Sequence, residues 1–297
     1  MSRLWYKQPA SKWEEALALG NGRMGAMIFG KVNEERIQVN EDSMWYGAPA
    51  QRNNPDTLKY LPEIRKLILE GQIGKAERLM KFAMSGCPES MHPYQTLGDI
   101  QLFFEKIGQV TEYERSLDLE QAVYRQTFTA GDVRYVREMF ISQPDQVMCM
   151  KLSADRKGSI SFSALLRRGR FFDGVRRKGE DGICLYGNLG KGGLDFAMQL
   201  TAKAKGGRVC VIGEHLIVED ADEVILYFAS GTTFRMENVE SELQAQIDRA
   251  AAEEYETLLR RHVEDYRSLY GRVELQIGEQ TGDESEVSSY DAIPTDE

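Results

Sequence analysis

The 297-residue sequence is poor in the residues that build metal sites and disulfide frameworks. It has three histidines and four widely spaced cysteines, and it contains no C-x-x-C pair and no Cys/His cluster. We therefore expect no metal site and no cofactor. Cys149, Cys184 and Cys210 lie in apolar runs, where a cysteine usually acts as a small buried hydrophobe with a reduced thiol.

Long apolar segments are also lacking. No run of 18 apolar residues is present, which argues against a transmembrane helix, and the N-terminus lacks the apolar core of a signal peptide. The formal net charge of −10 argues against a nucleic-acid partner, because phosphates would be repelled. These features predict a soluble cytoplasmic protein with no membrane partner, and they are compatible with a neutral ligand such as a sugar.

What the sequence does contain is a long series of short apolar runs between residues 113 and 234. Residues 122–128 and 160–165 alternate between apolar and polar side chains, residues 147–152 form a buried run, and Gly, Asp or Asn punctuates the gaps. Many strands at roughly ten-residue spacing indicate an antiparallel β-sandwich. No βαβ alternation appears, which disfavours a nucleotide-binding fold. We predict a mainly β domain over residues 1–238.

Three stretches depart from the strand pattern. Residues 55–84 carry apolar side chains at helical spacing and predict a helical insert that lies over a sheet and uses its apolar stripe for packing. Residues 239–278 predict a helical linker with a terminal strand, in which His262 is a hydrogen-bonded packing residue. Residues 279–297 contain seven acidic residues and no Lys or Arg, and they predict an acidic flexible linker.

The stretch from Leu17 to Trp45 holds the most distinctive motif. Residues 20–25 read Gly-Asn-Gly-Arg-Met-Gly, formally a G-x-G-x-x-G pattern, and Glu41 follows at about the 20-residue distance of a dinucleotide-binding loop. That loop needs a strand before it and a helix after it. Here a helical turn precedes the motif, and the apolar run that follows is too short for the helix. We interpret the motif as a tight turn between two strands.

Several motifs of this chain occur together in one known family. They are Leu4-Trp5-Tyr6, Leu19-Gly20-Asn21-Gly22-Arg23, Asn40-Glu41-Asp42, Tyr94-Gln95-Thr96-Leu97-Gly98-Asp99, Ser230-Gly231-Thr232-Thr233-Phe234-Arg235 and Ile293-Pro294-Thr295-Asp296-Glu297. In this combination the chain resembles glycoside hydrolase family 95, the α-L-fucosidases, along nearly its whole length. Members of that family resemble it only over their first third or so.

The resemblance implies an N-terminal super-β-sandwich that is followed, in the family, by a helical linker, an (α/α)6 catalytic barrel and a C-terminal β domain. The implied reaction is inverting hydrolysis of terminal α-L-fucosyl or α-L-galactosyl linkages, which needs two carboxyls roughly 6.5–9.5 Å apart. The catalytic residues of the family belong to the barrel, so none is carried over and we expect the chain alone to be inactive. The implied partners are a fucosylated oligosaccharide, bound by the whole enzyme, and the enzyme's own catalytic barrel.

Three polar and aromatic groups are candidates for the rim of the sugar pocket or for a domain interface. Trp and Tyr suit the faces of sugars, and Asn, Gln and Arg can hydrogen-bond hydroxyls. The candidates are Asn21 and Arg23; Asn40, Glu41 and Trp45; and His92, Tyr94 and Gln95. The other interpretation, which the sequence leaves open, is that these residues fix strand ends and the domain interface.

Two further hypotheses concern what the chain could do without a barrel. Glu41, Asp42 and Asp99 could form a carboxylate pair within the chain, but Asp42 and Asp99 suit turns that their side chains hold through backbone hydrogen bonds. A free-standing carbohydrate-binding β-sandwich would instead show an exposed aromatic platform and bind sugar on its own.

A basic cluster lies in the second half of the predicted sandwich. Six Arg and Lys residues fall between positions 167 and 178, around a predicted hairpin. Such a run indicates a solvated hairpin edge, where like charges block pairing with another strand, or a docking surface for another domain.

Overall fold

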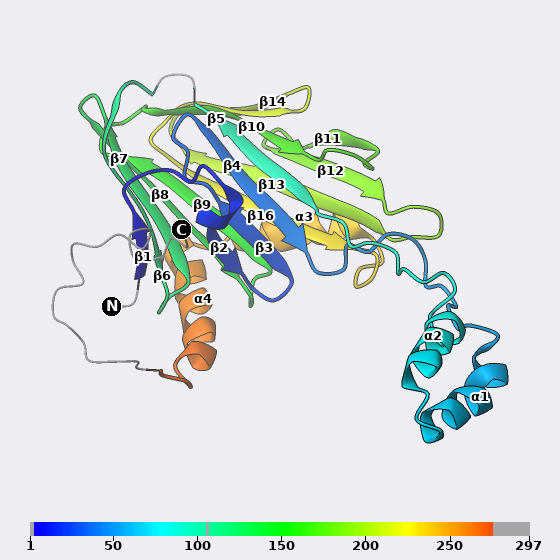
Figure 1. The fold of residues 1–297 in the computed structure, drawn as a ribbon. Helices are drawn as coiled ribbons and strands as arrows, with labels where there is room; N and C mark the ends of the chain where they lie inside the picture. The colour runs from blue at the N-terminus through cyan, green and yellow to red at the C-terminus, as the bar shows by residue number, and fades with distance from the viewer. Residues whose placement is uncertain (1–2, 105–106, 276–297) are drawn as a thin grey trace.

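The computed structural model describes residues 3–104 and 107–275. Within these residues, two antiparallel sheets pack face to face as a β-sandwich, two helices cover one outer face, and a helical hairpin extends away from it (Figure 1). The prediction of a mainly β sandwich of antiparallel sheets, with a helical insert and C-terminal helices, is confirmed.

Sixteen strands are present in the described part of the chain, and neighbours in each sheet pair antiparallel. The nine-stranded sheet has the order β1 (Arg3–Tyr6), β6 (Val110–Asp118), β7 (Val123–Ala130), β8 (Val133–Ser142), β9 (Val147–Ala154), β16 (Glu223–Thr232), β13 (Asp195–Lys205), β12 (Gly182–Asn188) and β11 (Gly174–Lys178). The seven-stranded sheet has the order β14 (Arg208–Ile212), β15 (His215–Ala221), β10 (Ile160–Arg167), β5 (Gly98–Phe103), β4 (Glu34–Glu41), β3 (Met24–Ile28) and β2 (Leu17–Gly20).

The main core lies between the two sheets. The buried side chains of β4 are Glu35, Ile37, Val39 and Glu41, which is the period-two pattern of a strand with one face on a core. The two apolar residues, Ile37 and Val39, pack in the core between the sheets. The two carboxylates lie at the ends of the same inward face. Because a buried carboxylate needs partners, both ends of β4 require polar contacts.

Helices α3 (Val239–Ala251) and α4 (Tyr255–Tyr270) cover the outer face of the nine-stranded sheet. Leu243 and Leu258 pack there against strand residues such as Phe140. Because the central strands β13 and β16 are covered on both faces, their residues are buried in continuous runs rather than alternately. His262 of α4 stacks on Phe140 with ring centroids 5.0 Å apart, and its Nε2 lies 3.0 Å from the Gln121 carbonyl oxygen. His262 is therefore a hydrogen-bonded packing residue, as predicted.

The basic segment 167–178 contributes to the attachment of α3. Strand β11 is the outermost strand of its sheet, in agreement with the predicted edge. Arg176 and Lys178 of this strand pair with Glu240 of α3 at 3.6 and 2.6 Å. The Arg176 guanidinium also lies 3.7 Å from the centre of the Tyr186 ring. Two basic side chains of the cluster thus hold the helical segment against the sandwich.

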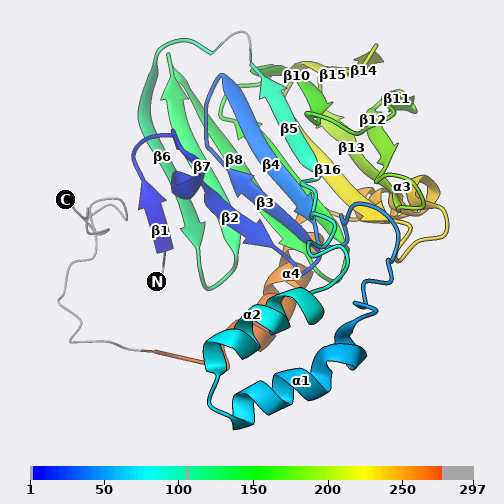
Figure 2. The same ribbon diagram turned by 45° about the vertical axis from the view of Figure 1, so that its right-hand side comes forward.

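The predicted helical insert consists of α1 (Thr57–Leu69) and an antiparallel partner, α2 (Ile73–Ala83). The expectation that the insert lies over a sheet is wrong: the hairpin extends beyond the sandwich in both ribbon views (Figures 1 and 2). Its buried side chains, Ile64, Ala76 and Ala83, are those of a single helix-to-helix seam. Helical periodicity predicts that a face is covered but does not identify the surface that covers it.

The C-terminal part of the predicted linker is described only in part. Residues 273–275 do not lie in a strand, residues 276–278 of the predicted terminal strand lie outside the described residues, and so does the predicted acidic linker 279–297. Among the helices of the described chain, none combines the length and the apolar character that crossing a membrane would require.

A buried charge pair joins the two sheets at the first end of β4. Glu35 lies 3.8 Å from the Arg137 guanidinium of β8 and accepts a hydrogen bond from the Gly30 amide. Arg137 also donates to the carbonyls of Lys31 and Val32, and it stacks 4.0 Å from the centre of the Phe104 ring. Burial raises the pKa of Glu35 to about 7, although the positive charge of Arg137 opposes this shift.

The pKa of Glu35 predicts a specific pH dependence of stability. A carboxyl whose pKa is higher in the folded than in the unfolded state binds its proton more tightly when folded, so stability is lost as the pH rises from about 4.5 to about 7. The loss is about 3 kcal/mol for a shift of this size. We expect Glu35→Gln to remove this component, as measured by urea unfolding at several pH values. Glu34→Gln, on the exposed neighbouring residue, is the control, and an unchanged pH profile in Glu35→Gln would contradict the assignment.

Candidate functional site

The turn between β2 and β3 begins the candidate site. Gly22 has φ +87°, and the Asn21 side-chain oxygen accepts hydrogen bonds from the amides of Arg23 and Met24 at 3.0 and 2.8 Å. The strands on both sides pair antiparallel, so the G-x-G-x-x-G pattern forms a strand-to-strand turn, as interpreted, and not a dinucleotide-binding loop. The Asn21 amide nitrogen donates to the Ser142 carbonyl at the end of β8, which ties this turn to the opposite sheet.

Glu41 lies at the second end of β4 and is only 1% exposed. Its Oε2 accepts hydrogen bonds from the amide and hydroxyl of Ser43 at 2.7 and 2.5 Å, and the Ser43 hydroxyl lies 2.6 Å from that of Thr232 at the end of β16. Its Oε1 faces the guanidinium groups of Arg235 and Arg23 at 3.3 and 4.0 Å. Burial raises the pKa of Glu41 above its ordinary value, against the hydrogen bonds from Ser43.

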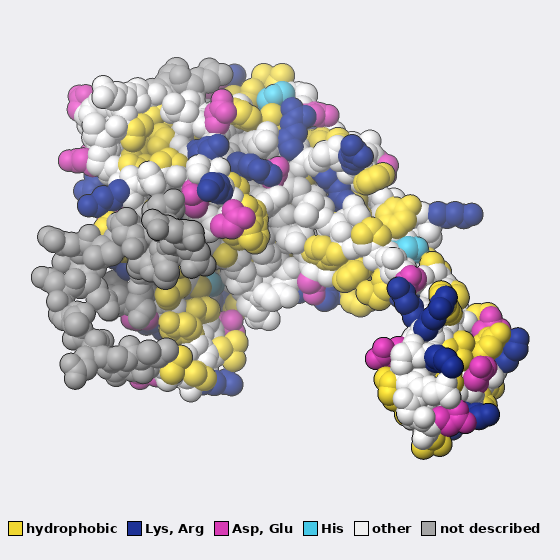
Figure 3. All heavy atoms as spheres, viewed as in Figure 1, with side chains coloured by type: hydrophobic (Ala, Val, Ile, Leu, Met, Phe, Trp, Pro, Cys, Tyr) yellow, Lys and Arg dark blue, Asp and Glu magenta, His cyan; other side chains and the backbone are white. Residues whose placement is uncertain are grey.

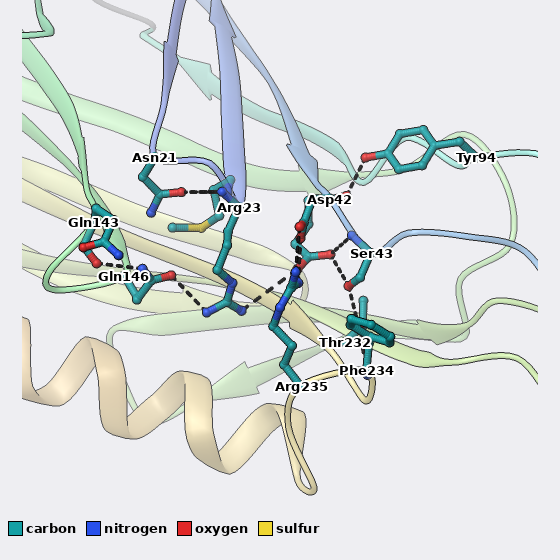
Figure 4. A network of polar contacts seen from close by, with 12 residues as sticks. Asn21, Arg23, Asp42, Ser43, Tyr94, Gln143, Gln146, Thr232, Phe234 and Arg235 are labelled. Atoms are coloured by element: carbon teal, nitrogen blue, oxygen red, sulfur yellow. Dashed lines mark hydrogen bonds and ion pairs between the residues drawn. The ribbon is translucent and has the colours of Figure 1, made fainter. Parts of the chain in front are cut away.

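Arg235 joins the two neighbouring acids. It contacts the Asp42 carboxylate through both terminal nitrogens, at 2.6 and 2.7 Å, while Nη1 also reaches Glu41 (Figure 4). The hydrogen bonds from Arg235 lower the pKa of Asp42. Arg23 completes the arrangement by donating to the Gln146 side chain at 3.0 Å. We call this set the corner cluster: Asn21, Arg23, Glu41, Asp42, Ser43, Gln146, Thr232 and Arg235.

Aromatic side chains border the corner cluster. The Tyr94 hydroxyl donates to the Glu41 carbonyl, and the Trp45 ring packs edge-on against Tyr94 with centroids 5.4 Å apart. Tyr46 and His92 make a similar contact at 5.7 Å. Trp45 remains 45% exposed, so this border presents an aromatic surface to the solvent next to hydrogen-bonding groups.

The residues selected from the sequence therefore come together, but in two kinds of role. Asn21, Arg23 and Glu41 belong to the corner cluster, whereas Trp45, His92 and Tyr94 lie on its aromatic border. The remaining two residues make hydrogen bonds that fix the backbone. The Asn40 side-chain oxygen accepts a hydrogen bond from the Leu97 backbone amide at 3.2 Å, and the Gln95 backbone amide donates to the Met44 carbonyl at 2.7 Å.

Sequence reasoning does not select Arg235, Thr232, Gln146 or Phe234 as site residues. Three of them lie in the Ser230–Arg235 motif of the family resemblance, which could have signalled a role. Their contacts with β4 cannot be seen in the sequence because Arg235 and Glu41 are 194 positions apart. Phe234 is 65% exposed beside the Asp42 and Arg235 pair, and it adds a further aromatic group to the border.

The acids of the corner do not form a hydrolytic pair on their own. Glu41 is almost completely buried. The same Arg235 nitrogen contacts one oxygen of Glu41 and one oxygen of Asp42, at 3.3 and 2.6 Å. These two oxygens are therefore closer together than the roughly 6.5–9.5 Å that separates the carboxyls of an inverting pair. Asp99 is occupied by an ion pair with Arg36 at 3.1 Å. No group of His, Cys, Asp and Glu in the described part of the chain could hold a metal ion.

Loss of Arg235 should destabilise the corner in a pH-dependent manner. We expect Arg235→Met to cost about 2 kcal/mol of unfolding free energy, because the buried Glu41 loses a close cation. The raised pKa of Glu41 should rise further, and a raised carboxyl pKa lowers stability as the pH increases, so the deficit should grow towards high pH. Chemical unfolding at acidic and alkaline pH measures both effects.

The control for this variant is an ion pair that lies on the surface. Arg208 and Glu219 pair at 2.8 Å but are both largely exposed, so Arg208→Met should change the unfolding free energy by less than about 1 kcal/mol at any pH. Equal effects of the two substitutions would contradict the role assigned to Arg235.

Comparisons with known proteins agree with the fold and with the motifs. Residues 4–237 match the family described as "Glycosyl hydrolase family 65, N-terminal domain". The chain is 32% identical over 311 residues to "Alpha-L-fucosidase 2" of Arabidopsis thaliana, covering 93% of this chain and 36% of that protein. It is 28% identical to "Probable alpha-fucosidase A" of Aspergillus niger, covering 94% and 38%. The protein of the same name from Aspergillus oryzae is 27% identical, covering 99% and 44%.

The chain thus spans less than half the length of each of these relatives. A solved structure, "Putative kojibiose phosphorylase from human microbiome", matches 90% of this chain and 38% of its own length with a TM-score of 0.54 and 11% identity, a likeness of fold alone. The resemblance to the α-L-fucosidase family is confirmed by these relatives. The chain belongs to the glycosyl hydrolase family 65 N-terminal domain family.

Proposed function

We propose that this chain is the N-terminal domain of an inverting α-L-fucosidase that hydrolyses terminal α-L-fucosyl or related α-L-galactosyl linkages. The observation that carries the proposal is the similarity to three proteins named as fucosidases over 93 to 99% of this chain. The chemistry would belong to a catalytic barrel beyond this domain. The acids of the corner cluster support this division, because Glu41 is buried and the Asp42 carboxylate is paired with Arg235.

The domain's own role in this proposal is to support the barrel and to supply part of the rim of its sugar pocket. Exposed Trp45 and Phe234 offer aromatic faces, which suit the apolar faces of sugars. They stand next to Arg235 and Asp42, which can hydrogen-bond to hydroxyls. The corner cluster beside this border is held by contacts between both sheets, and such a fixed base suits a rim.

A second candidate function is that of a free-standing carbohydrate-binding module. The same exposed aromatic border favours it, because such a platform binds sugar without a catalytic domain. The two functions differ in what the 297-residue chain does on its own.

The isolated chain should neither hydrolyse nor bind a fucoside. We expect no turnover of a nitrophenyl α-L-fucoside or a 2′-fucosyl oligosaccharide above the blank, and no heat in calorimetry with millimolar L-fucose or D-galactose. Turnover by the chain would contradict the assignment of catalysis to a separate domain. Binding heat without turnover would favour the free-standing module.

Trp45 separates a rim from a purely structural corner. In a full-length enzyme that contains this domain, Trp45→Ala should raise KM about tenfold with little change in kcat, because lost stacking on a sugar costs about 1 kcal/mol or slightly more. Trp13→Ala removes a similarly exposed indole outside the aromatic border and should leave KM unchanged. An unchanged KM in Trp45→Ala would indicate that the border only fixes strand ends and the domain interface.

A further inference from the structure

The α1–α2 hairpin exposes apolar side chains that its own helices cannot cover. Leu58 and Leu69 of α1 are 80% and 87% exposed, and Phe82 of α2 is also largely exposed. A shallow groove along α1 is lined by Leu58, Leu61, Pro62, Arg65, Lys66, Leu69 and Glu70. Figure 3 shows the hairpin as a separate lobe on which apolar side chains alternate with charged ones. The two helices bury only the apolar side chains between them. The exposed apolar side chains on the outside of the hairpin, which we call the outer apolar stripe, can be buried only by another surface.

The hairpin is nevertheless held in a defined position. The Thr57 hydroxyl donates to the Ala83 carbonyl at 2.6 Å, and the Asn54 amide donates to the Phe82 carbonyl at 2.9 Å, so the two helices are fastened at their open end. The segments that enter and leave the hairpin are joined at its base by the Trp45–Tyr94 bridge. The outer apolar stripe is therefore presented from a fixed base, next to the corner cluster.

The charge of the hairpin limits the kinds of partner. Residues 57–83 contain six Lys or Arg and three Glu, which gives the hairpin a net charge of +3 on a chain of −10. Two hairpins that paired symmetrically would place like charges against each other, which disfavours a second copy as the occupant. A surface that is apolar at its centre and acidic around it would fit the hairpin better.

The position of the hairpin relates it to the rest of an enzyme. In both ribbon views the hairpin and α4 extend below the sandwich (Figures 1 and 2). The relatives carry 56 to 64% of their length outside the region that this chain matches. A large domain seated on this side would meet the aromatic border and the hairpin together.

We propose that the α1–α2 hairpin is a docking arm whose apolar stripe is buried against the catalytic domain of the same enzyme. The inference rests on the proposed function for the existence of that domain. The arm starts from the two segments that carry Trp45 and Tyr94, so its contact with the catalytic domain positions the aromatic border over that domain. The surface that receives the arm is apolar with an acidic rim.

The test compares the 297-residue chain with the full-length enzyme by limited trypsin cleavage within the hairpin, at Arg65 and Lys66. Cleavage there should be at least about tenfold slower in the full-length enzyme. Burial of the leucine side chains against the catalytic domain would reduce the local unfolding of the hairpin that trypsin needs. The double substitution L58E/L69E should restore the fast rate in the full-length enzyme. It should leave the Tm of the isolated chain unchanged, because both side chains are exposed there.

Ile212→Glu is the matched control, because Ile212 is also a largely exposed apolar residue, at the end of β14 and outside the hairpin. It should leave cleavage of the arm slow. Equal cleavage rates in the isolated chain and the full-length enzyme would overturn the proposal. So would a dimer of the isolated chain that L58E/L69E dissociates in sedimentation velocity, or binding to phosphatidylserine vesicles that the same substitution abolishes.

A fucoside assay separates this proposal from the proposed function. If the arm is protected in the full-length enzyme but no fucoside is hydrolysed, the docking arm stands and the substrate is wrong. If fucoside is hydrolysed but the arm is cleaved equally fast in both forms, the substrate stands and the docking arm is overturned.

Discussion

The two buried carboxylates of β4 govern how the sheets of the sandwich meet. Glu35 and Glu41 end the inward face of one strand. Glu35 pairs with Arg137 of β8 in the opposite sheet, and Glu41 pairs with Arg235 in the turn that follows β16 of the same sheet. An unpaired buried charge costs several kcal/mol, so any slip of one sheet past the other would leave a carboxylate unpaired. The pairs therefore specify one register between the sheets at both ends of β4.

The corner cluster follows from that constraint. Because Glu41 is fixed between the sheets, Asp42 and Ser43 leave β4 in a defined direction, and the chain passes through Trp45 into the hairpin. Glu41, Trp45 and the α1–α2 hairpin thus follow one another along one segment of the chain. We propose that the domain performs no chemistry of its own and holds surfaces in position for a catalytic domain. A sandwich whose two sheets are joined by ion pairs at both ends of β4 suits that role.

Much of the fold can be predicted from local pattern. The period-two runs, the glycine turn at Gly22 and the helical insert all depend on neighbouring residues, and the structure contains each of them. The pairing of Glu41 with Arg235 could not be predicted, because a strand pattern identifies the buried face of β4 but not which distant side chain lies opposite. For the same reason, periodicity predicts that the hairpin's apolar stripe is covered but does not say by which surface, and the expectation of a sheet is wrong. The family motif, and not periodicity, points to the segment that contains Arg235.

Hydroxyl-radical footprinting tests the central claim, that the border and the arm face the catalytic domain. The exposed side chains of Trp45, Phe234 and Phe82 report on that surface, and the exposed Trp13 outside it is an internal reference. The account predicts that all three are oxidised readily in the isolated chain and are protected in the full-length enzyme, while Trp13 is oxidised equally in both. Equal oxidation of Trp45, Phe234 and Phe82 in the two forms would contradict it.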